Sequence, residues 1–193
     1  MALTVSNVVL PGPVKIYVGP ASTTAPTSSI AKGTAWGGSW VEVGFTAGGA
    51  MLKLGTEKAE AVMDQYNAPV KDIITQQSIE LNFVAGEGTL TNLKQALGYG
   101  TVTSGSTEST FGVAGTEVLG TNYAYGVEVY APGATSSNSW YQRYIIWIGS
   151  SQEVGDVELK KDGIMGIQYN VKGIIDTTQT STEQLWKRID RVV

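Results

Sequence analysis

The chain has 193 residues, with 13 basic and 17 acidic side chains and a formal net charge of −4. It contains no cysteine and no histidine, which excludes disulfides and thiolate metal sites and removes the most common general base and metal ligand. The acidic balance also argues against a protein that binds a nucleic-acid backbone, because such binding needs clustered lysine and arginine.

Most of the chain predicts β-strands, because apolar and polar side chains alternate with a period of two. In the clearest case, Ile79, Leu81 and Phe83 face opposite Glu80 and Asn82. The alternating segments, in chain order, are 14–18, 41–45, 73–85, 123–129 and 165–171.

The segment 140–148 is apolar on both faces apart from Gln142 and Arg143. Such a strand is expected to be covered on both sides, either within the fold or by another subunit. Segments rich in Ser, Thr, Gly and Pro separate the strands and are predicted to be loops. They comprise 20–38, 98–120 and 131–139.

One helix is predicted over 89–98, because three leucines fall on one stripe. Thr89 or Thr91 can cap its start, and Gly98 is a suitable left-handed stop. The stripe consists of Leu90, Leu93 and Leu97. A weaker helical pattern covers 182–191, with an apolar face made of Leu185, Trp186 and Ile189.

Together these elements predict a mainly β fold, a β-sandwich or partial barrel with one packed helix. We find no internal repeat and no domain boundary, so residues 1–193 are expected to form a single domain. The first charged residue is Lys15, and no stretch approaches the ~18 to 20 apolar residues of a membrane span. We therefore expect neither a secretory signal nor membrane insertion.

Nothing in the sequence marks an active site, and we expect no catalytic, cofactor or metal-binding residues. The acidic residues are interspersed with lysines, as on solvated strand faces, and no pair resembles two carboxylates that flank a cleft. The aromatic residues allow two interpretations, either a stacking platform for sugars or a seal for a core or subunit interface. We favour the seal. These residues are Trp36, Trp40, Trp140, Tyr141 and Trp147.

The order of elements between Trp40 and Gly98 carries a resemblance to a known family. A strand at 40–44, a turn at 46–49 and a strand at 51–54 precede a mixed-charge arm over 56–72. The long alternating strand and the helix described above follow. This arrangement resembles the central region of siphophage major tail tube proteins, and the opening and closing strands are similar to that family in order and character.

The resemblance implies a structural virion protein of a long non-contractile tail, not an enzyme. Such subunits form hexameric rings that stack into a tube for DNA ejection, and their strands complete an inner β-barrel between subunits. The implied partners are other copies of the chain, the tape measure protein, and the tail terminator and distal tail proteins. Phage DNA would pass without specific binding. The implied location is the virion tail, assembled in the host cytoplasm.

Three sets of residues are assigned by the resemblance and the strand pattern together. The lumen candidates are Gln76, Ser78, Glu80 and Asn82. The arm, expected to be poorly ordered until rings stack, supplies the inter-ring candidates Glu57, Lys58, Glu60, Asp64, Tyr66, Pro69 and Lys71. Two terminal arms, 1–12 and 183–193, are expected to serve assembly. The subunit-interface candidates are Leu10, Trp140, Trp147, Leu185 and Trp186.

A second hypothesis comes from a different class of protein. The same strands and aromatic residues would suit a carbohydrate-binding β-sandwich module of a tail fibre or secreted protein.

Overall fold

The computed structural model describes residues 13–61, 71–102, 109–110, 120–130, 140–152 and 166–191. Within these ranges the chain is mainly β, as predicted, and α1 (Leu90–Leu97) is the only helix. The strands are β1 (Val14–Pro20), β2 (Val41–Glu42), β3 (Thr46–Ala61), β4 (Lys71–Ala85), β5 (Thr101–Val102), β6 (Ser109–Thr110), β7 (Tyr123–Tyr130), β8 (Tyr141–Ser151), β9 (Ile167–Ile174) and β10 (Trp186–Arg191).

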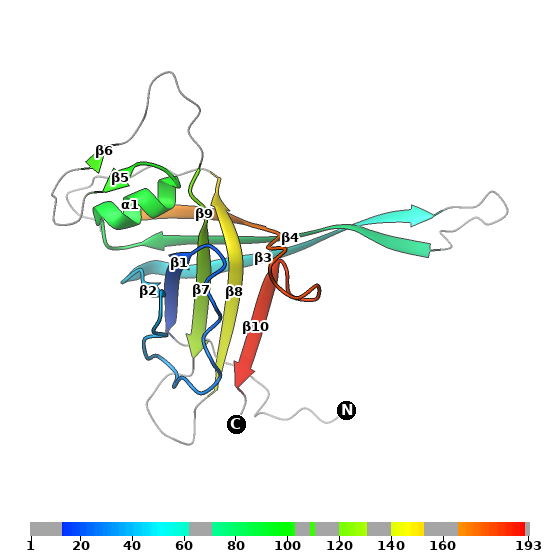
Figure 1. Cartoon of the computed structure of the whole chain (residues 1–193), viewed down its shortest axis with the longest axis horizontal. Coiled ribbons are helices and arrows are strands. Elements are labelled where there is room, and N and C mark those ends of the chain that lie inside the picture. Colours follow the sequence, from blue (N-terminus) through cyan, green and yellow to red (C-terminus); the bar gives the residue numbers. More distant parts are fainter. Residues whose placement is uncertain are drawn as a thin grey trace.

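The main sheet is antiparallel and has the strand order β2-β1-β7-β8-β9-β4-β3. The first half of β8 pairs with β10 and its second half with β9, so β8 belongs to two groups of strands. Figure 1 shows β3 and β4 crossing β1, β7 and β8 at a steep angle. The path ends at β2 and β3, so the described strands form a partial barrel that remains open.

The inner core lies between the group that contains β1, β7 and β8 and the group that contains β9, β4 and β3. Ile79, Leu81 and Phe83 of β4 are buried in it, as their alternation predicts, and the Phe83 ring stacks on Tyr169 of β9 with centroids 4.3 Å apart. Burial raises the pKa of Tyr125 and Tyr169 well above the usual value, so both hydroxyls stay neutral. The inner core is built mainly from β1, β4, β7 and β9, with Ile146 of β8 and Ala96 of α1.

The helix closes one end of the inner core, and its caps are those predicted. Thr89 Oγ1 accepts a hydrogen bond from the Asn92 N–H at 3.1 Å, and Gly98 ends the helix in the left-handed conformation at φ 71°. The leucine stripe is not the buried face, however. The buried residues are Asn92 and Ala96. The Asn92 side-chain amide donates a hydrogen bond to the carbonyl of Val43 at 3.1 Å, which holds this face of the helix against the body.

A second group of buried residues, the aromatic cluster, covers the outer face of β1, β7 and β8. It contains Trp36 and Trp40 from the 20–40 loop, and Trp36 stacks on Tyr17 with centroids 4.3 Å apart. The Trp36 ring rests directly on Gly126, where any side chain would collide with it. Strand β8 is therefore covered on both sides within the subunit, as its sequence predicts. The members are Tyr17, Trp36, Trp40, Ala124, Ile145 and Trp147.

A buried ion pair fixes the same loop to the sheet. Arg143 of β8 and Glu128 of β7 are fully buried, and their charged groups lie 2.8 Å apart. Arg143 also donates to the carbonyls of Thr27 and Ile30, at 3.1 and 2.9 Å, and Glu128 accepts from the Gly33 N–H at 3.1 Å. Both charges are satisfied by groups that the loop brings to them, which is the condition for burying them.

The helix predicted over 182–191 is wrong, because this segment contains strand β10. It runs antiparallel to β8, with Trp186 opposite Ile146 and Arg191 opposite Tyr141. Trp186 packs against the inner core and Ile189 against the aromatic cluster. A strand that packs against a different cluster on each face carries apolar residues on both faces. The apolar residues of β10 therefore fall at spacings that also occur on one face of a helix.

Two other predicted boundaries also differ. The strand predicted over 41–45 is paired only at Val41 and Glu42, because Gly44 at φ 95° turns the chain toward β3. The loop predicted over 98–120 contains the short strands β5 and β6, which pair with each other.

Candidate assembly surfaces

The hairpin of β3 and β4 is the largest projecting feature of the subunit. The two strands pair from Thr46 with Ala85 to Ala61 with Lys71, whereas β9 covers β4 only from Glu80 to Ala85. Beyond that point the hairpin is a two-stranded ribbon that extends far from the body (Figure 1). An isolated ribbon has little surface to bury within its own subunit.

The arm predicted over 56–72 corresponds to the outer part of this ribbon. Its described ends, 56–61 and 71–72, form paired strands, although the arm was expected to be ordered only by ring stacking. Backbone pairing and the Lys58–Asp72 contact at 3.8 Å hold them together. The inter-ring candidates Glu57, Lys58, Glu60 and Lys71 are all exposed on this ribbon, and Asp64, Tyr66 and Pro69 lie outside the described residues.

The four lumen candidates share the outer, polar face of the hairpin. Ser78, Glu80 and Asn82 are half-buried opposite the core residues, and Gln76 is exposed. Sequence reasoning missed their neighbours. Lys53 of β3 lies 3.4 Å from Glu80, and Lys172 of β9 stands opposite Glu80 on the other side. The face therefore carries a row of alternating charges.

A bulge interrupts the strand predicted over 73–85. Glu57 pairs with Gln76 but Lys58 pairs with Ile74, which leaves Thr75 without a cross-strand partner. Beyond the bulge, the even-numbered residues of β4 lie on the core side and the odd-numbered residues on the polar face. Ile73 consequently lies on the polar face and Ile74 on the core side, and both side chains are about half exposed.

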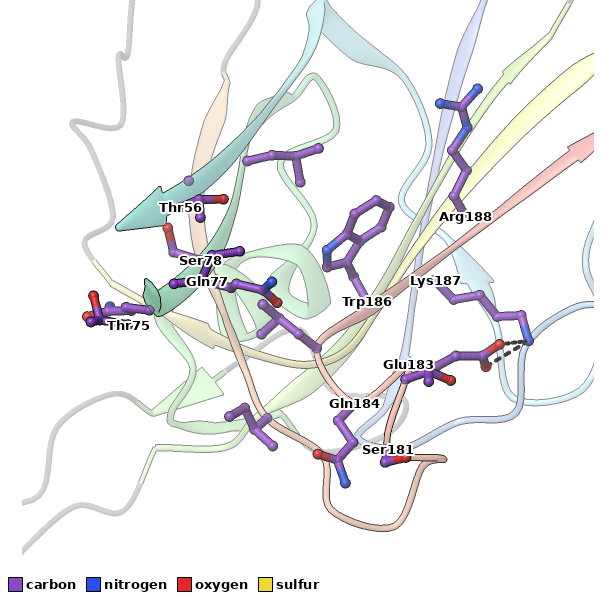
Figure 2. Close-up of a pocket in the computed structure, with 17 residues that line it drawn as sticks. Thr56, Thr75, Gln77, Ser78, Ser181, Glu183, Gln184, Trp186, Lys187 and Arg188 are labelled. Atoms are coloured by element: carbon purple, nitrogen blue, oxygen red, sulfur yellow. Dashed lines mark hydrogen bonds and ion pairs between the residues drawn. The ribbon is translucent and has the colours of Figure 1, made fainter. Parts of the chain in front are cut away.

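A groove of about 1030 Å³ lies between the core side of the ribbon and the chain that leads into β10. Figure 2 shows Trp186 on one wall and Gln77, from the core side of the hairpin, on the other, and the lumen candidates Gln76 and Ser78 also border the groove. Three of its apolar residues are more than half exposed, at 55, 54 and 58% for Leu54, Ile74 and Ile175. The apolar lining consists of Leu54, Ile74, Ile175, Leu185 and Trp186.

Asp176 holds the loop that forms one wall of this groove. Its side chain is buried, and it accepts hydrogen bonds from the Thr178 N–H and hydroxyl, at 3.0 and 2.6 Å, and from the Gln179 amide at 3.1 Å. Burial alone would raise the pKa of Asp176. The hydrogen bonds from Thr178, Gln179 and Ser22 outweigh burial and lower the pKa to about 2.

Replacing Asp176 with alanine is expected to cost about 1–3 kcal/mol of unfolding free energy at neutral pH. Because the folded-state pKa lies below the ordinary value of 3.8, this stabilisation is full above about pH 4 and is lost as the pH falls toward 2. Chemical denaturation of both proteins between pH 7 and 2 should show the difference shrinking. Asp72→Ala, in an exposed pair, is the control and should cost under about 1 kcal/mol. A difference independent of pH would contradict this account.

The predicted interface residues fall into different environments. Trp147 is 3% exposed, and its indole N–H donates to the carbonyl of Glu183 at 2.6 Å. Trp140, Leu185 and Trp186 are half-buried, so each keeps some surface that a neighbour could cover. Leu10 and the arm 1–12 lie outside the described residues. The interface role stays a prediction for all five.

The burial of the aromatic residues argues against the interpretation that they bind sugars. Trp36, Trp40 and Trp147 are at most 8% exposed, and Tyr141 is buried. A ring that stacks on a sugar must present a free face to solvent, and these rings present none. These four residues are buried within the subunit, where they seal a core and not a subunit interface.

Within the described ranges there is no group of three or more carboxylates that could hold a metal ion. In the same ranges, no helix is long and apolar enough to cross a membrane.

The comparison with family models identifies one family. The sequence matches a family model described as phage tail tube protein over residues 1–185. The match includes every described element except β10. A search of curated proteins found no match.

Proposed function

Because the chain belongs to the phage tail tube protein family, we propose that it is the major tail tube subunit of a long non-contractile tail. Membership of the family makes it a structural protein of the virion tail that associates with itself into a tube. On this proposal the whole chain, residues 1–193, is one tail tube domain with no enzymatic activity.

The observation that carries the proposal is the open sheet with its projecting hairpin. Strand β3 is 16 residues long and lies at the end of the strand order, so one edge of its backbone has no described partner. Soluble proteins avoid long exposed edges, and closing a sheet is the complete solution. Six subunits in a ring would close their sheets on one another and form the inner barrel.

The ribbon suggests how successive rings stack. It carries exposed charged residues of both signs together with the half-exposed Ile73 and Ile74, and its own subunit covers neither kind. A neighbour in the next ring would bury the aliphatic residues and pair the charges. This surface is the one to which we assign the inter-ring contacts.

The polar face of the hairpin suits a channel for DNA. In the row, Glu80 pairs with Lys53 and lies opposite Lys172 on the neighbouring strand, and the neutral residues Ser78 and Asn82 flank it. A face with little net field neither traps phosphates nor repels them strongly, so DNA could slide past it. The tape measure protein would occupy the same channel before ejection, and the terminator and distal tail proteins would contact the tube ends.

Electron microscopy of the purified protein is the direct test of tube formation. Stacked rings or tubes with a central channel support the proposal. Dispersed monomers at high protein concentration, in buffers that maintain the fold, would oppose it. Retention on a polysaccharide column would then favour the carbohydrate-binding alternative.

The variant Ser78→Lys/Glu80→Lys tests the channel face. It removes the carboxylate between Lys53 and Lys172 and creates a basic patch repeated in every ring. Like charges on neighbouring strands should cost about 0.2–1 kcal/mol per pair, so the subunit should still fold. We expect tails of normal appearance that eject DNA slowly, with rescue at higher salt because phosphate binding weakens steeply with ionic strength.

The control is Asp190→Lys on β10, which changes the charge by +2, against +3 for the double variant, away from this face. It should eject DNA at the normal rate. Normal ejection by the double variant at low salt would mean that this face does not line the channel.

A further inference from the structure

The groove and the projecting residue Phe45 lie on opposite sides of the subunit. Figure 1 shows β2 and the start of β3 on one side of the body and the projecting hairpin with β10 on the other. Phe45 directly precedes β3, and at 81% it is the most exposed of the large apolar side chains described. The subunit thus presents an apolar hollow on one side and an apolar projection on the other.

The charged residues around the two features are mostly paired within the subunit. In the groove wall, Lys187 pairs with Glu183 at 2.8 Å and Arg188 pairs with Asp190 at 2.7 Å. Around Phe45, Lys15 pairs with Glu42 at 2.9 Å.

Glu87 is the remaining charged residue beside Phe45. Its carboxylate accepts the Phe45 N–H at 3.3 Å and makes no ion pair with the described residues.

We propose that Phe45 of one subunit inserts into the groove of the next, between Leu54, Ile175 and Trp186. This inference rests on the proposed ring assembly and names the lateral contact that builds it. The contact joins two different surfaces, so it is heterologous, and repeating it with closing rotation generates a ring. It buries the exposed side chains of Leu54 and Ile175 together with the Phe45 ring.

A contact between two identical grooves would serve less well. Two concave surfaces leave the space between them unfilled. Residues 1–12 of a neighbour are the other apolar occupant that the sequence offers. We choose Phe45 because it lies on the side of the subunit opposite the groove, where repetition of one contact can close a ring.

The first experiment uses two variants that each remove one side of the contact, Phe45→Asp and Ile175→Asp. Both residues are exposed, so both proteins should remain folded monomers, with the critical concentration for tube formation raised by about tenfold or more. An equimolar mixture should give dimers that do not grow, because each pair retains one intact contact and no free complementary ends. The controls are Ile174→Asp, next to the groove but not in its lining, and Met51→Asp on the polar face.

The second experiment uses the absence of cysteine from the chain. The double variant Phe45→Cys/Ile175→Cys should form a ladder of disulfide-linked oligomers that ends at a closed ring, and each single variant should form no ladder. Dimers from Ile175→Cys alone would indicate groove-to-groove contact and overturn the proposal. Normal tubes from Phe45→Asp, with none from Ile175→Asp, would assign the groove to another occupant and also overturn it. Failure of the wild-type protein to form tubes would instead count against the proposed function.

Discussion

Replacing Arg143 with leucine is expected to destabilise the subunit by about 3–5 kcal/mol, which is enough to unfold a marginally stable protein. The substitution leaves the Glu128 carboxylate buried without its partner, since both side chains are fully buried in the intact protein. It also removes the donors for the carbonyls of Thr27 and Ile30. Chemical denaturation followed by tryptophan fluorescence would measure the loss.

A double variant separates the ion pair from the packing around it. Arg143→Leu/Glu128→Leu removes both charges and should recover part of the lost stability, because no unpaired charge remains buried. The control Lys187→Leu breaks a partly exposed pair with Glu183 and should cost under about 1 kcal/mol. A loss below about 1 kcal/mol for Arg143→Leu alone would show that water reaches Glu128.

Shortening the hairpin is expected to abolish tube formation while leaving the subunit folded. Residues 58–75 can be replaced by Asn-Gly, because Glu57 and Gln76 are cross-strand partners and a two-residue turn joins such partners with the correct twist. The inner core loses nothing by this change, since the described residues removed are not among its members. Sedimentation should find a monomer, and electron microscopy should find no tubes.

As a control, the unfolding free energy of the shortened protein is compared with that of the wild type. An unfolding free energy within about 1 kcal/mol of the wild type would show that the body is intact. Tubes of normal length from the shortened protein would contradict the assignment of ring contacts to the ribbon.

Alternation and capping made much of the fold predictable. In β4, Ile79, Leu81 and Phe83 face one way because a single face of that strand is buried, and the sequence displays this directly. The helix boundaries followed from Thr89 and Gly98, whose roles depend only on local backbone geometry. Strand β10 was not predictable in the same way, because the layers that bury its two faces come from distant parts of the chain.

The candidate surfaces show the same division between local and distant information. The shared polar face of Ser78, Glu80 and Asn82 was predicted from spacing within one strand. Lys53 and Lys172 were missed because only strand pairing brings them beside Glu80. The groove was missed for the same reason, since its walls come from the hairpin and from the chain around β10. The bulge at Thr75 has no sequence signal comparable to a glycine or proline.

The buried ion pair also determines the order in which the subunit can fold. Arg143 and Thr27 are separated by 116 positions, and Glu128 and Gly33 by 95, so these hydrogen bonds close very long loops. Contacts of such sequence separation form slowly, because the chain loses its loop entropy before it gains the contact. We therefore expect the 20–40 loop to dock after β7 and β8 have paired. Until it docks, Arg143 and Glu128 remain hydrated, and the hydrophobic surface that Trp36 and Trp40 later cover is open to other newly synthesised copies.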